Sequence, residues 1–204
     1  MKVTSPTSLA DACRALANDP ALVPIAGATD VLVHWPVRTA EHDKSYLNLL
    51  RIGELRHMTW AGDSLTLGAL ATYWDAIQDK QVAQEFPLLI DAARQVGAIQ
   101  IQSRGTWAGN IANGSPAADG VPVLMAYDAE VVLASSSATR RVPLASYYAG
   151  HRRSVRRPES RRPIGSPRWC QEVARRRRSG GPSAPRCWQQ PASPPSRRAL
   201  GRAG

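Results

Sequence analysis

The spacing of apolar residues predicts three amphipathic helices in the first half of the chain. The first covers residues 9–18 and follows Ser8-Leu-Ala-Asp11, which has the form of a capping box. The second covers residues 73–79 and follows another capping box, Thr72-Tyr-Trp-Asp75. The third covers residues 87–96, because its first residue is a proline and the apolar residues after it fall on one side.

Shorter apolar or alternating runs predict strands that are separated by turn residues. A tight turn at Ala61-Gly62-Asp63 favours a hairpin, and a second hairpin is predicted at residues 130–143. The predicted strands cover residues 22–26, 45–50, 57–60, 64–67, 130–134 and 140–143, and a further helix covers 121–126. Helices and short sheets are interspersed, so we expect an α/β fold (α+β, with mixed sheets).

A glycine-containing loop follows the first predicted strand. In Pro24-Ile-Ala-Gly-Ala-Thr-Asp-Val-Leu32 the apolar run stops at Gly27-Ala28-Thr29-Asp30 and then resumes. A strand, a tight turn and a short helix opening at Thr29 or Asp30 would direct unpaired N–H groups toward a ligand above the turn. Asp30 has a simpler alternative role as the N-cap of that helix. The loop lacks the G-x-G-x-x-G spacing of dinucleotide-binding folds.

A longer glycine-rich stretch runs from Val96 to Asp119 and has the features of a nucleotide cradle. It holds four glycines, with Arg104 as its only cation and Asp119 as its only anion. Glycine leaves the main chain accessible, so consecutive N–H groups can bind a phosphate while short polar side chains orient it. Asp119 would repel phosphate and is suited to accept a hydrogen bond from a hydroxyl or a ring N–H. The alternative is an ordinary Gly/Ser/Asn loop followed by a proline turn.

Three segments carry a resemblance to a known family. They are, in order, Pro24-Ile-Ala-Gly-Ala-Thr-Asp30, Leu67-Gly-Ala-Leu-Ala-Thr72 and Arg104-Gly-Thr-Trp-Ala-Gly-Asn-Ile-Ala-Asn-Gly-Ser-Pro-Ala-Ala-Asp119. They resemble the FAD-binding (medium) subunit of the molybdenum hydroxylases, the group of xanthine dehydrogenase, carbon monoxide dehydrogenase and 4-hydroxybenzoyl-CoA reductase. The resemblance covers roughly residues 6–159 and implies a two-lobed PCMH-type FAD-binding domain, related to the vanillyl-alcohol oxidase fold. We accordingly expect a first FAD-binding lobe at residues 1–55, a second at 56–159 and a separate tail at 160–204.

The resemblance also implies an FAD-dependent oxidoreductase subunit and the residues that hold its cofactor. The two glycine-rich loops would hold the pyrophosphate and ribityl chain, Asp119 would bond the flavin end, and the loop before Thr72 would lie at the edge of the site. The implied FAD-binding residues are Ile25, Ala26, Gly27, Ala28, Thr29, Asp30, Val31, Leu32, Val96, Thr106, Trp107, Ala108, Gly109, Asn110 and Asp119.

In the intact family, substrate is oxidised at a molybdopterin centre on another subunit. Electrons then cross [2Fe-2S] clusters to FAD, which passes them to NAD⁺, oxygen or another acceptor. The resemblance thus implies a heterotrimeric complex in which an iron–sulfur subunit and a molybdopterin-binding subunit are the partners, and in which those two cofactors lie outside this chain.

Two alanines depart from the family pattern. The family usually has paired glycines where this chain has Gly27-Ala28 and Ala108-Gly109. An alanine forced to a positive φ costs roughly 1–2 kcal/mol, and its methyl group could crowd a phosphate. If φ is negative at these positions, that cost largely disappears.

No side chain is assigned as a catalytic acid or base or as a metal ligand. The four histidines are scattered without H-x-x-x-H or H-E-x-x-H spacing, and the three cysteines lack C-x-x-C spacing. Any chemistry therefore belongs to a bound cofactor. The cysteine pattern and the lack of a run of ~18 apolar residues favour a cytoplasmic protein that does not span a membrane.

Charge is distributed very unevenly along the chain. Residues 1–150 hold 11 basic and 14 acidic side chains, a net charge of −3, whereas residues 151–204 hold 15 arginines and 2 acids, a net charge of +13. Residues 1–150 therefore give no electrostatic reason to expect that the protein binds nucleic acid. From about Ser160 the composition is rich in Arg, Pro, Ser, Gly and Ala, and it cannot bury enough apolar surface to offset chain entropy, so we expect disorder.

Two interpretations of residues 160–204 are open. In one, the tail is a basic arm in which Arg175-Arg-Arg-Arg178 contacts phosphates and Trp169 or Trp188 stacks on bases, so that the protein binds nucleic acid. In the other, the tail is read out of frame, and the product is a truncated, inactive fragment with weak or no FAD binding. The second is favoured, because Arg186-Cys-Trp-Gln-Gln-Pro191 can be encoded so that another frame reads Lys-Val-Leu-Ala-Ala-Ala.

Overall fold

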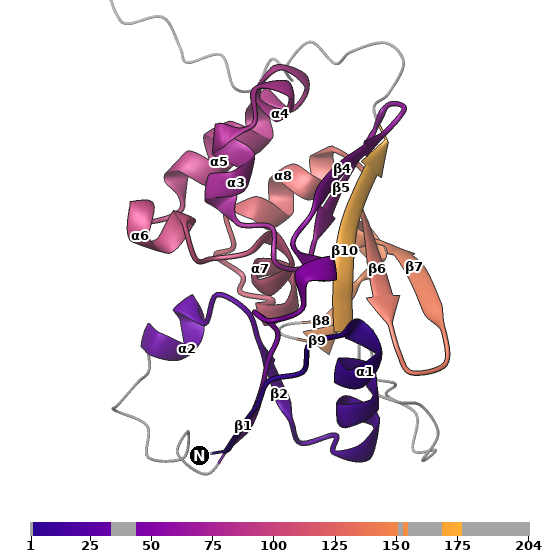
Figure 1. Ribbon diagram of the computed structural model, residues 1–204. Helices are drawn as coiled ribbons and strands as arrows, with labels where there is room; N and C mark the ends of the chain where they lie inside the picture. The colour runs from indigo at the N-terminus through magenta and orange to yellow at the C-terminus, as the bar shows by residue number, and fades with distance from the viewer. Residues whose placement is uncertain (1, 34–43, 151–152, 155–168, 177–204) are drawn as a thin grey trace, which may run out of the picture.

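A small parallel sheet forms the N-terminal part of the fold (Figure 1). The computed structural model describes residues 2–33, 44–150, 153–154 and 169–176. Strand β3 lies at the centre of this sheet and pairs in parallel with β1 and β2, and the connections between the strands contain α1 and α2. The elements are β1 Lys2–Thr4, α1 Leu9–Asn18, β2 Val23–Ile25, α2 Thr29–Val33 and β3 Ser45–Asn48. The predicted helix at 9–18 and the two predicted strands are confirmed.

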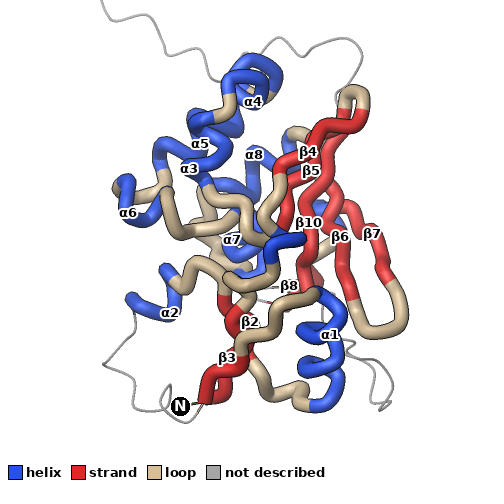
Figure 2. The backbone as a smooth tube through the Cα atoms, in the orientation of Figure 1, coloured by secondary structure: helices blue, strands red, loops and turns tan. Residues whose placement is uncertain are grey.

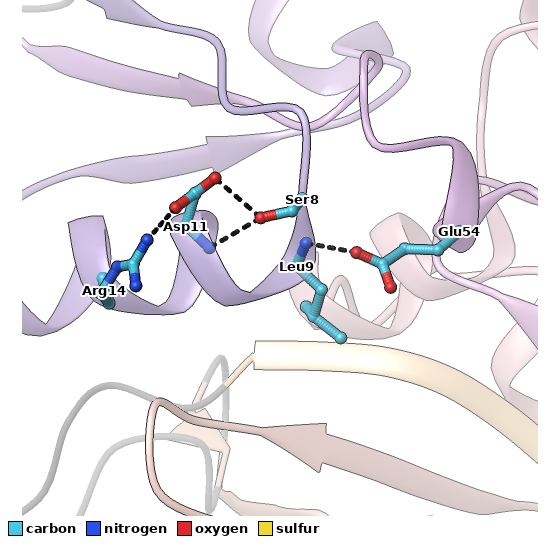
Figure 3. A network of polar contacts seen from close by, with 5 residues as sticks. All are labelled: Ser8, Leu9, Asp11, Arg14 and Glu54. Carbon is cyan, nitrogen blue, oxygen red and sulfur yellow. Dashed lines mark hydrogen bonds and ion pairs between the residues drawn. The ribbon is translucent and has the colours of Figure 1, made fainter.

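Helix α1 begins at a network of polar contacts (Figure 3). The Ser8 hydroxyl accepts a hydrogen bond from the Asp11 N–H at 3.1 Å and donates one to the Asp11 carboxylate at 2.8 Å. Asp11 also pairs with Arg14, and the Leu9 N–H donates to the Glu54 carboxylate. The Ser8 hydroxyl, followed by Arg14, holds the pKa of Asp11 below its usual range. The Glu54 contact ties α1 to the segment that leads into the second sheet.

The second sheet is antiparallel and has five strands in the order β4-β5-β10-β6-β7. Strands β4 and β5 form the predicted hairpin around Gly62, and β6 and β7 form the second predicted hairpin. Strand β10 lies between the two hairpins and pairs with β5 and β6. The bounds are β4 Met58–Ala61, β5 Ser64–Gly68, β6 Glu130–Ala134, β7 Thr139–Pro143 and β10 Trp169–Arg176, and a separate pair consists of β8 Tyr148–Gly150 and β9 Arg153–Ser154.

The disorder predicted for residues 160–204 is wrong for residues 169–176, which form strand β10. Its residue Glu172 pairs with Gly68 on one side and with Val132 on the other. A segment between two hairpins can form backbone hydrogen bonds on both of its edges, and these offset a chain entropy that its apolar content alone would not. The remainder of the tail, residues 160–168 and 177–204, lies outside the described residues, and with it Trp188 and most of the proposed basic arm.

Helices α3 to α8 gather on one side of the five-stranded sheet, whereas α1 and α2 lie with the parallel sheet (Figure 2). The predicted helices at 73–79, 87–96 and 121–126 are confirmed within a residue or two as α3, α5 and α8. The bounds are η2 Gly53–Leu55, α3 Tyr73–Gln78, α4 Lys80–Glu85, α5 Pro87–Gln95, α6 Ile99–Gln102, α7 Trp107–Asn113, α8 Gly120–Ala126 and η3 Leu144–Ser146. None of the helices in the described ranges is long and apolar enough to cross a bilayer.

One hydrophobic core joins the helices to both sheets. Trp107 of α7 and Phe86, which precedes α5, are among its largest fully buried side chains. Phe86 stacks on Trp60 of β4 with ring centroids 5.6 Å apart and meets Tyr127 edge to face at 5.3 Å. Leu47 of the parallel sheet belongs to the same cluster. The N-terminal sheet is therefore packed against the rest of the molecule, and its loops have fixed neighbours.

Candidate functional site

Three loops that are far apart in the sequence meet beside helix α7. The first loop, residues 26–29, joins β2 to α2; the middle loop, residues 68–72, joins β5 to α3; and the last loop, residues 103–106, joins α6 to α7. These are the three segments that carried the family resemblance. The contacts that join them are between main-chain atoms for the most part, because small residues let the backbones approach.

Gly27 brings the first loop into contact with the last. A Cβ atom on Gly27 would lie 1.8 Å from the carbonyl oxygen of Arg104 and 2.6 Å from its carbonyl carbon. The Arg104 side chain also contacts Gly27, because its Nε donates a hydrogen bond to the Gly27 carbonyl oxygen at 3.4 Å. Only glycine can occupy position 27 without separating the two loops.

The middle loop joins the last through a short antiparallel bridge between Thr72 and Thr106. The Tyr73 N–H donates to the Gly105 carbonyl oxygen at 3.2 Å, and the Trp107 N–H donates to the Ala71 carbonyl oxygen at 3.2 Å. Each threonine is also the N-cap of the helix that follows it, α3 or α7, and its hydroxyl accepts from a backbone N–H of that helix. Two capped helices consequently begin side by side at the bridge.

Trp107 and Tyr73 form the base of the site. Their rings meet edge to face with centroids 4.6 Å apart and an interplanar angle of 66°. Gly120, at the start of α8, lies against the indole: a Cβ on it would be 3.0 Å from Trp107 Cζ3 and 3.3 Å from Asn110 Oδ1. The close packing fixes α7 relative to α8 and so fixes Asp119, which immediately precedes Gly120.

The Asp119 carboxylate is exposed and makes no capping hydrogen bond to α8. Its negative charge nevertheless affects the ionisation of Tyr73. Burial of the Tyr73 phenol, and then the negative charge of Asp119, raise the pKa of that phenol well above its ordinary value. Asp119 is thus a carboxylate held beside the base of the site and available to accept a hydrogen bond from a ligand.

Two buried polar atoms of α7 have no hydrogen-bond partner in the described part of the chain. They are Trp107 Nε1, a donor, and Asn110 Oδ1, an acceptor. Buried polar atoms are nearly always paired, so the Oδ1 of the half-buried Asn110 indicates a place where a polar ligand completes the bonding, whereas Trp107 is fully buried.

Residues 1–160 match the model of the family described as "FAD binding domain in molybdopterin dehydrogenase". The chain belongs to this family of FAD-binding domains. The match includes all three loops and every residue implied to bind FAD.

Proteins similar to this FAD-binding domain are subunits of several dehydrogenases. It is 34% identical over 147 residues to the xanthine dehydrogenase FAD-binding subunit of Escherichia coli O157:H7, an alignment that covers 70% of this chain and 49% of the relative. It is 31% identical over 126 residues to the carbon monoxide dehydrogenase medium chain of Hydrogenophaga pseudoflava, covering 62% of this chain and 44% of the relative. The chain therefore spans about half the length of the relatives it matches.

Solved structures share the fold. A chain of carbon monoxide dehydrogenase from Hydrogenophaga pseudoflava superposes with a TM-score of 0.78 at 25% identity, and covers 89% of this chain and 60% of its own length. A chain of quinoline 2-oxidoreductase from Pseudomonas putida 86 gives a TM-score of 0.77 at 22% identity, with 88% of this chain and 60% of the other covered. The mixed α/β fold expected from the sequence is confirmed.

The residues at the site fit FAD in the described structure. Gly27 lets the backbones of the first and last loops come into direct contact, and the unpaired Oδ1 of the half-buried Asn110 offers an acceptor. Asp119 offers an exposed carboxylate that makes no capping hydrogen bond to α8. A dinucleotide with a diphosphate, sugar hydroxyls and ring N–H groups presents complements to all of these groups.

The residues implied to bind FAD do not all lie in equivalent places. Trp107 and Ala108 are buried, with 0% and 3% of their surface exposed, so they could reach a ligand through main-chain atoms only. Thr106, Gly109 and Asn110 lie with them at the first turn of α7. Ala26, Gly27 and Ala28 lie in the first loop, Ile25 ends β2, and Thr29, Asp30, Val31 and Leu32 lie in α2. Val96 is the C-cap of α5. Their contact with FAD stays a prediction.

The two departures from the family's glycine pattern behave differently. Ala28 has φ = 58°, so it carries the backbone strain foreseen for an alanine at this position. Ala108 lies inside α7 and has no such strain. Helix α2 opens at Thr29, and its first hydrogen bond runs from the Leu32 N–H to the Ala28 carbonyl. The alternative role of Asp30 as N-cap is therefore wrong, because Asp30 lies within the first turn.

Sequence reasoning missed the residues that hold the loops together. Tyr73 and Gly120 pack on Trp107, and Thr72 pairs with Thr106. The capping box at Thr72 was a usable signal, since it predicted where α3 begins. No local pattern in the sequence predicts that Tyr73 packs against a helix that begins more than 30 residues further along the chain.

Proposed function

We propose that this chain binds FAD in the space bounded by the three loops and serves as the electron-transfer FAD subunit of a molybdenum hydroxylase. The observation that carries the proposal is the contact of residues 103–106 with both other loops, with residues 26–29 at Gly27 and with residues 68–72 at the bridge between Thr72 and Thr106. Family membership supports the identity of the cofactor. The proposed reaction is the passage of electrons from [2Fe-2S] clusters through FAD to an acceptor.

Each group at the site has a binding role in this proposal. Backbone N–H groups of the first loop bind the diphosphate, together with the N–H of Ala108; the N–H groups of Trp107, Gly109 and Asn110 in the first turn of α7 already donate within the protein. Asn110 bonds the ribityl chain, and Asp119 accepts a hydrogen bond from the flavin end. The Tyr73 phenol stays protonated at neutral pH, so it adds no negative charge beside Asp119.

The chain's own residues supply binding, orientation and electrostatics, while FAD supplies the redox chemistry. FAD can exchange electrons singly or in pairs, which suits a step between one-electron clusters and a two-electron acceptor. No side chain is assigned a proton-transfer role. The partners proposed are an iron–sulfur subunit and a molybdopterin-binding subunit, in keeping with relatives that are named as subunits or medium chains.

The decisive experiment is to mix the purified chain with FAD, remove free FAD by desalting, and record the visible absorption spectrum. Flavin absorbance retained at near one FAD per chain supports the proposal. A folded but colourless chain contradicts it and favours the fragment with weak or no FAD binding. Circular dichroism on the same sample separates that outcome from simple unfolding.

The subunit role needs a second experiment, made in cells of the source organism. The tagged chain is purified and analysed for iron, molybdenum and co-purifying polypeptides. Stoichiometric iron and molybdenum support assembly into a complex. Recovery of the tagged chain alone, with FAD bound, would limit the proposal to flavin binding.

A further inference from the structure

Arg104 is held in a defined position at the contact between the first and last loops. Its Nε donates to the Gly27 carbonyl oxygen at 3.4 Å, and its own carbonyl lies against the Gly27 Cα where a Cβ would stand. The residue is therefore fixed both by its main chain and by its side chain. The hydrogen bond uses one nitrogen of the guanidinium and leaves the two terminal nitrogens, which carry four more N–H groups.

Arg104 also brings the only full positive charge found in the three loops and in α7. Residues 26–29 and 68–72 contain no charged side chain, and between residues 103 and 119 the charged side chains are Arg104 and Asp119. The negative charge of Asp119 acts on Tyr73, at the base of the site. Hydrogen bonds and ion pairs of the described residues connect the Arg104 side chain to Gly27 and to no carboxylate.

An arginine guanidinium without an acidic partner is suited to bind phosphate, because its planar N–H groups match two phosphate oxygens at once. Main-chain N–H groups contribute only partial charges, whereas the diphosphate of FAD is a full anion. A cation fixed at the contact of the two loops would neutralise part of that anion as it binds.

We infer that Arg104 is a diphosphate-binding residue of this chain, oriented by its hydrogen bond to Gly27; this inference rests on the proposed FAD site. The first loop supplies the carbonyl that orients the guanidinium, and the last loop supplies the guanidinium itself. Arg104 thus links the two loops and gives the site a preference for flavins that carry phosphate over those that do not.

The test compares R104Q, R104K and the control R94Q in the full-length chain. Arg94 is an exposed arginine of α5, so its replacement removes the same charge at a different place. Binding of FAD is titrated by flavin fluorescence at low and high salt, and riboflavin is titrated in parallel. Circular dichroism and the thermal midpoint establish that each variant is folded.

We expect R104Q to weaken FAD binding about tenfold at low salt, with a smaller loss at high salt, and to leave riboflavin binding unchanged. R104K should recover part of the loss because it keeps the charge, and R94Q should match the wild type. Equal losses for FAD and riboflavin at every salt concentration would mean that Arg104 only holds the loops together, and would overturn the inference.

The same titrations separate this inference from the proposed function. If the wild-type chain binds FAD and R104Q binds it within twofold of the wild type, the inference fails and the proposed function stands. If the folded wild-type chain binds no FAD, both fail together.

Discussion

The rings of Tyr73 and Trp107 meet edge to face at 4.6 Å and join the two helices that begin at the site. Trp107 is the second residue after Gly105, whose carbonyl accepts the Tyr73 N–H. Backbone and ring contacts between α3 and α7 therefore act at the same point. A change in the protonation or shape of Tyr73 should therefore alter both the free energy of unfolding and the geometry of the site.

The first prediction concerns the pH dependence of folding. Burial and then Asp119 raise the pKa of Tyr73 above its ordinary value of 10.0. Below that pH the phenol is protonated in both the folded and the unfolded state. Above it the unfolded chain loses a proton that the folded chain retains, so the free energy of unfolding should fall as pH rises, by up to about 1.4 kcal/mol per pH unit.

Urea unfolding of the wild type and of Tyr73→Phe, measured from about pH 8 to about pH 11, tests this linkage. The variant lacks the phenol, so its stability should decline less steeply above the ordinary tyrosine pKa. Parallel curves for the two proteins would show that Tyr73 titrates normally and that its phenol is accessible to water.

The second prediction concerns the paired helix caps. Thr72→Ala removes a capping box and should lower the free energy of unfolding by about 1 kcal/mol. Ser8→Ala removes the cap of α1, which begins away from the three loops, and should lower it by a similar amount. FAD titration separates the two variants, because only Thr72 is bridged to Thr106. Weaker binding in Thr72→Ala alone is expected; an equal effect in both would point to general destabilisation.

The third prediction concerns the contact between the first and last loops. Gly27→Ala places a methyl group 1.8 Å from a backbone oxygen that cannot rotate away. The loops must separate, which should lower the free energy of unfolding by about 1–3 kcal/mol and weaken FAD binding more than tenfold. Gly53→Ala is the control, since nothing lies within 4 Å of a Cβ there. Wild-type FAD affinity in Gly27→Ala would show that the flavin does not depend on this contact.

Local signals in the sequence predicted the elements, but not the contacts that build the site. Capping boxes at Ser8 and Thr72 gave the starts of α1 and α3 because a cap is encoded within four residues. The contact of Gly27 with Arg104 joins positions 77 residues apart, and periodicity carries no information at that distance. Glycine and cap motifs thus indicated which loops matter, while their mutual arrangement came only from the fold.

Short elements were missed for a different physical reason. Helix α4 has six residues and directly follows α3, because Asp79 ends α3 and also accepts hydrogen bonds from the Gln81 and Val82 N–H groups. Such a helix has too few turns to show an apolar period. Strand β10 was missed because its pairing partners, and not its composition, account for it.

The fourth prediction follows from the place of β10 in the sheet. A chain ending at residue 168 lacks β10 and leaves the facing edges of β5 and β6 unpaired, whereas a chain ending at residue 176 keeps all five strands. Unpaired edges promote association between sheets. The shorter chain should therefore show a lower thermal midpoint and more aggregation in light scattering. Identical behaviour of the two chains would mean that residues 169–176 do not stabilise the sheet.

The fifth prediction compares glycine substitutions at two alanines, Ala28 in the first loop and Ala108 in α7. Ala28 has φ = 58°, a conformation that is strained for alanine and unstrained for glycine, so Ala28→Gly should raise the free energy of unfolding by about 1 kcal/mol. Ala108 is helical and buried, so Ala108→Gly should lower it by at least about 1 kcal/mol through lost helix propensity and packing.

The same pair of variants tests how the first loop meets the flavin. Replacing Ala28 also removes a methyl group from the loop that is proposed to bind the diphosphate, so Ala28→Gly should bind FAD at least as tightly as the wild type. Chemical denaturation and FAD titration measure the two effects on the same samples. Because the stability changes have opposite signs, a general tolerance of glycine cannot explain both results. A loss of stability in Ala28→Gly would mean that the left-handed conformation at residue 28 is not the one that the folded protein adopts.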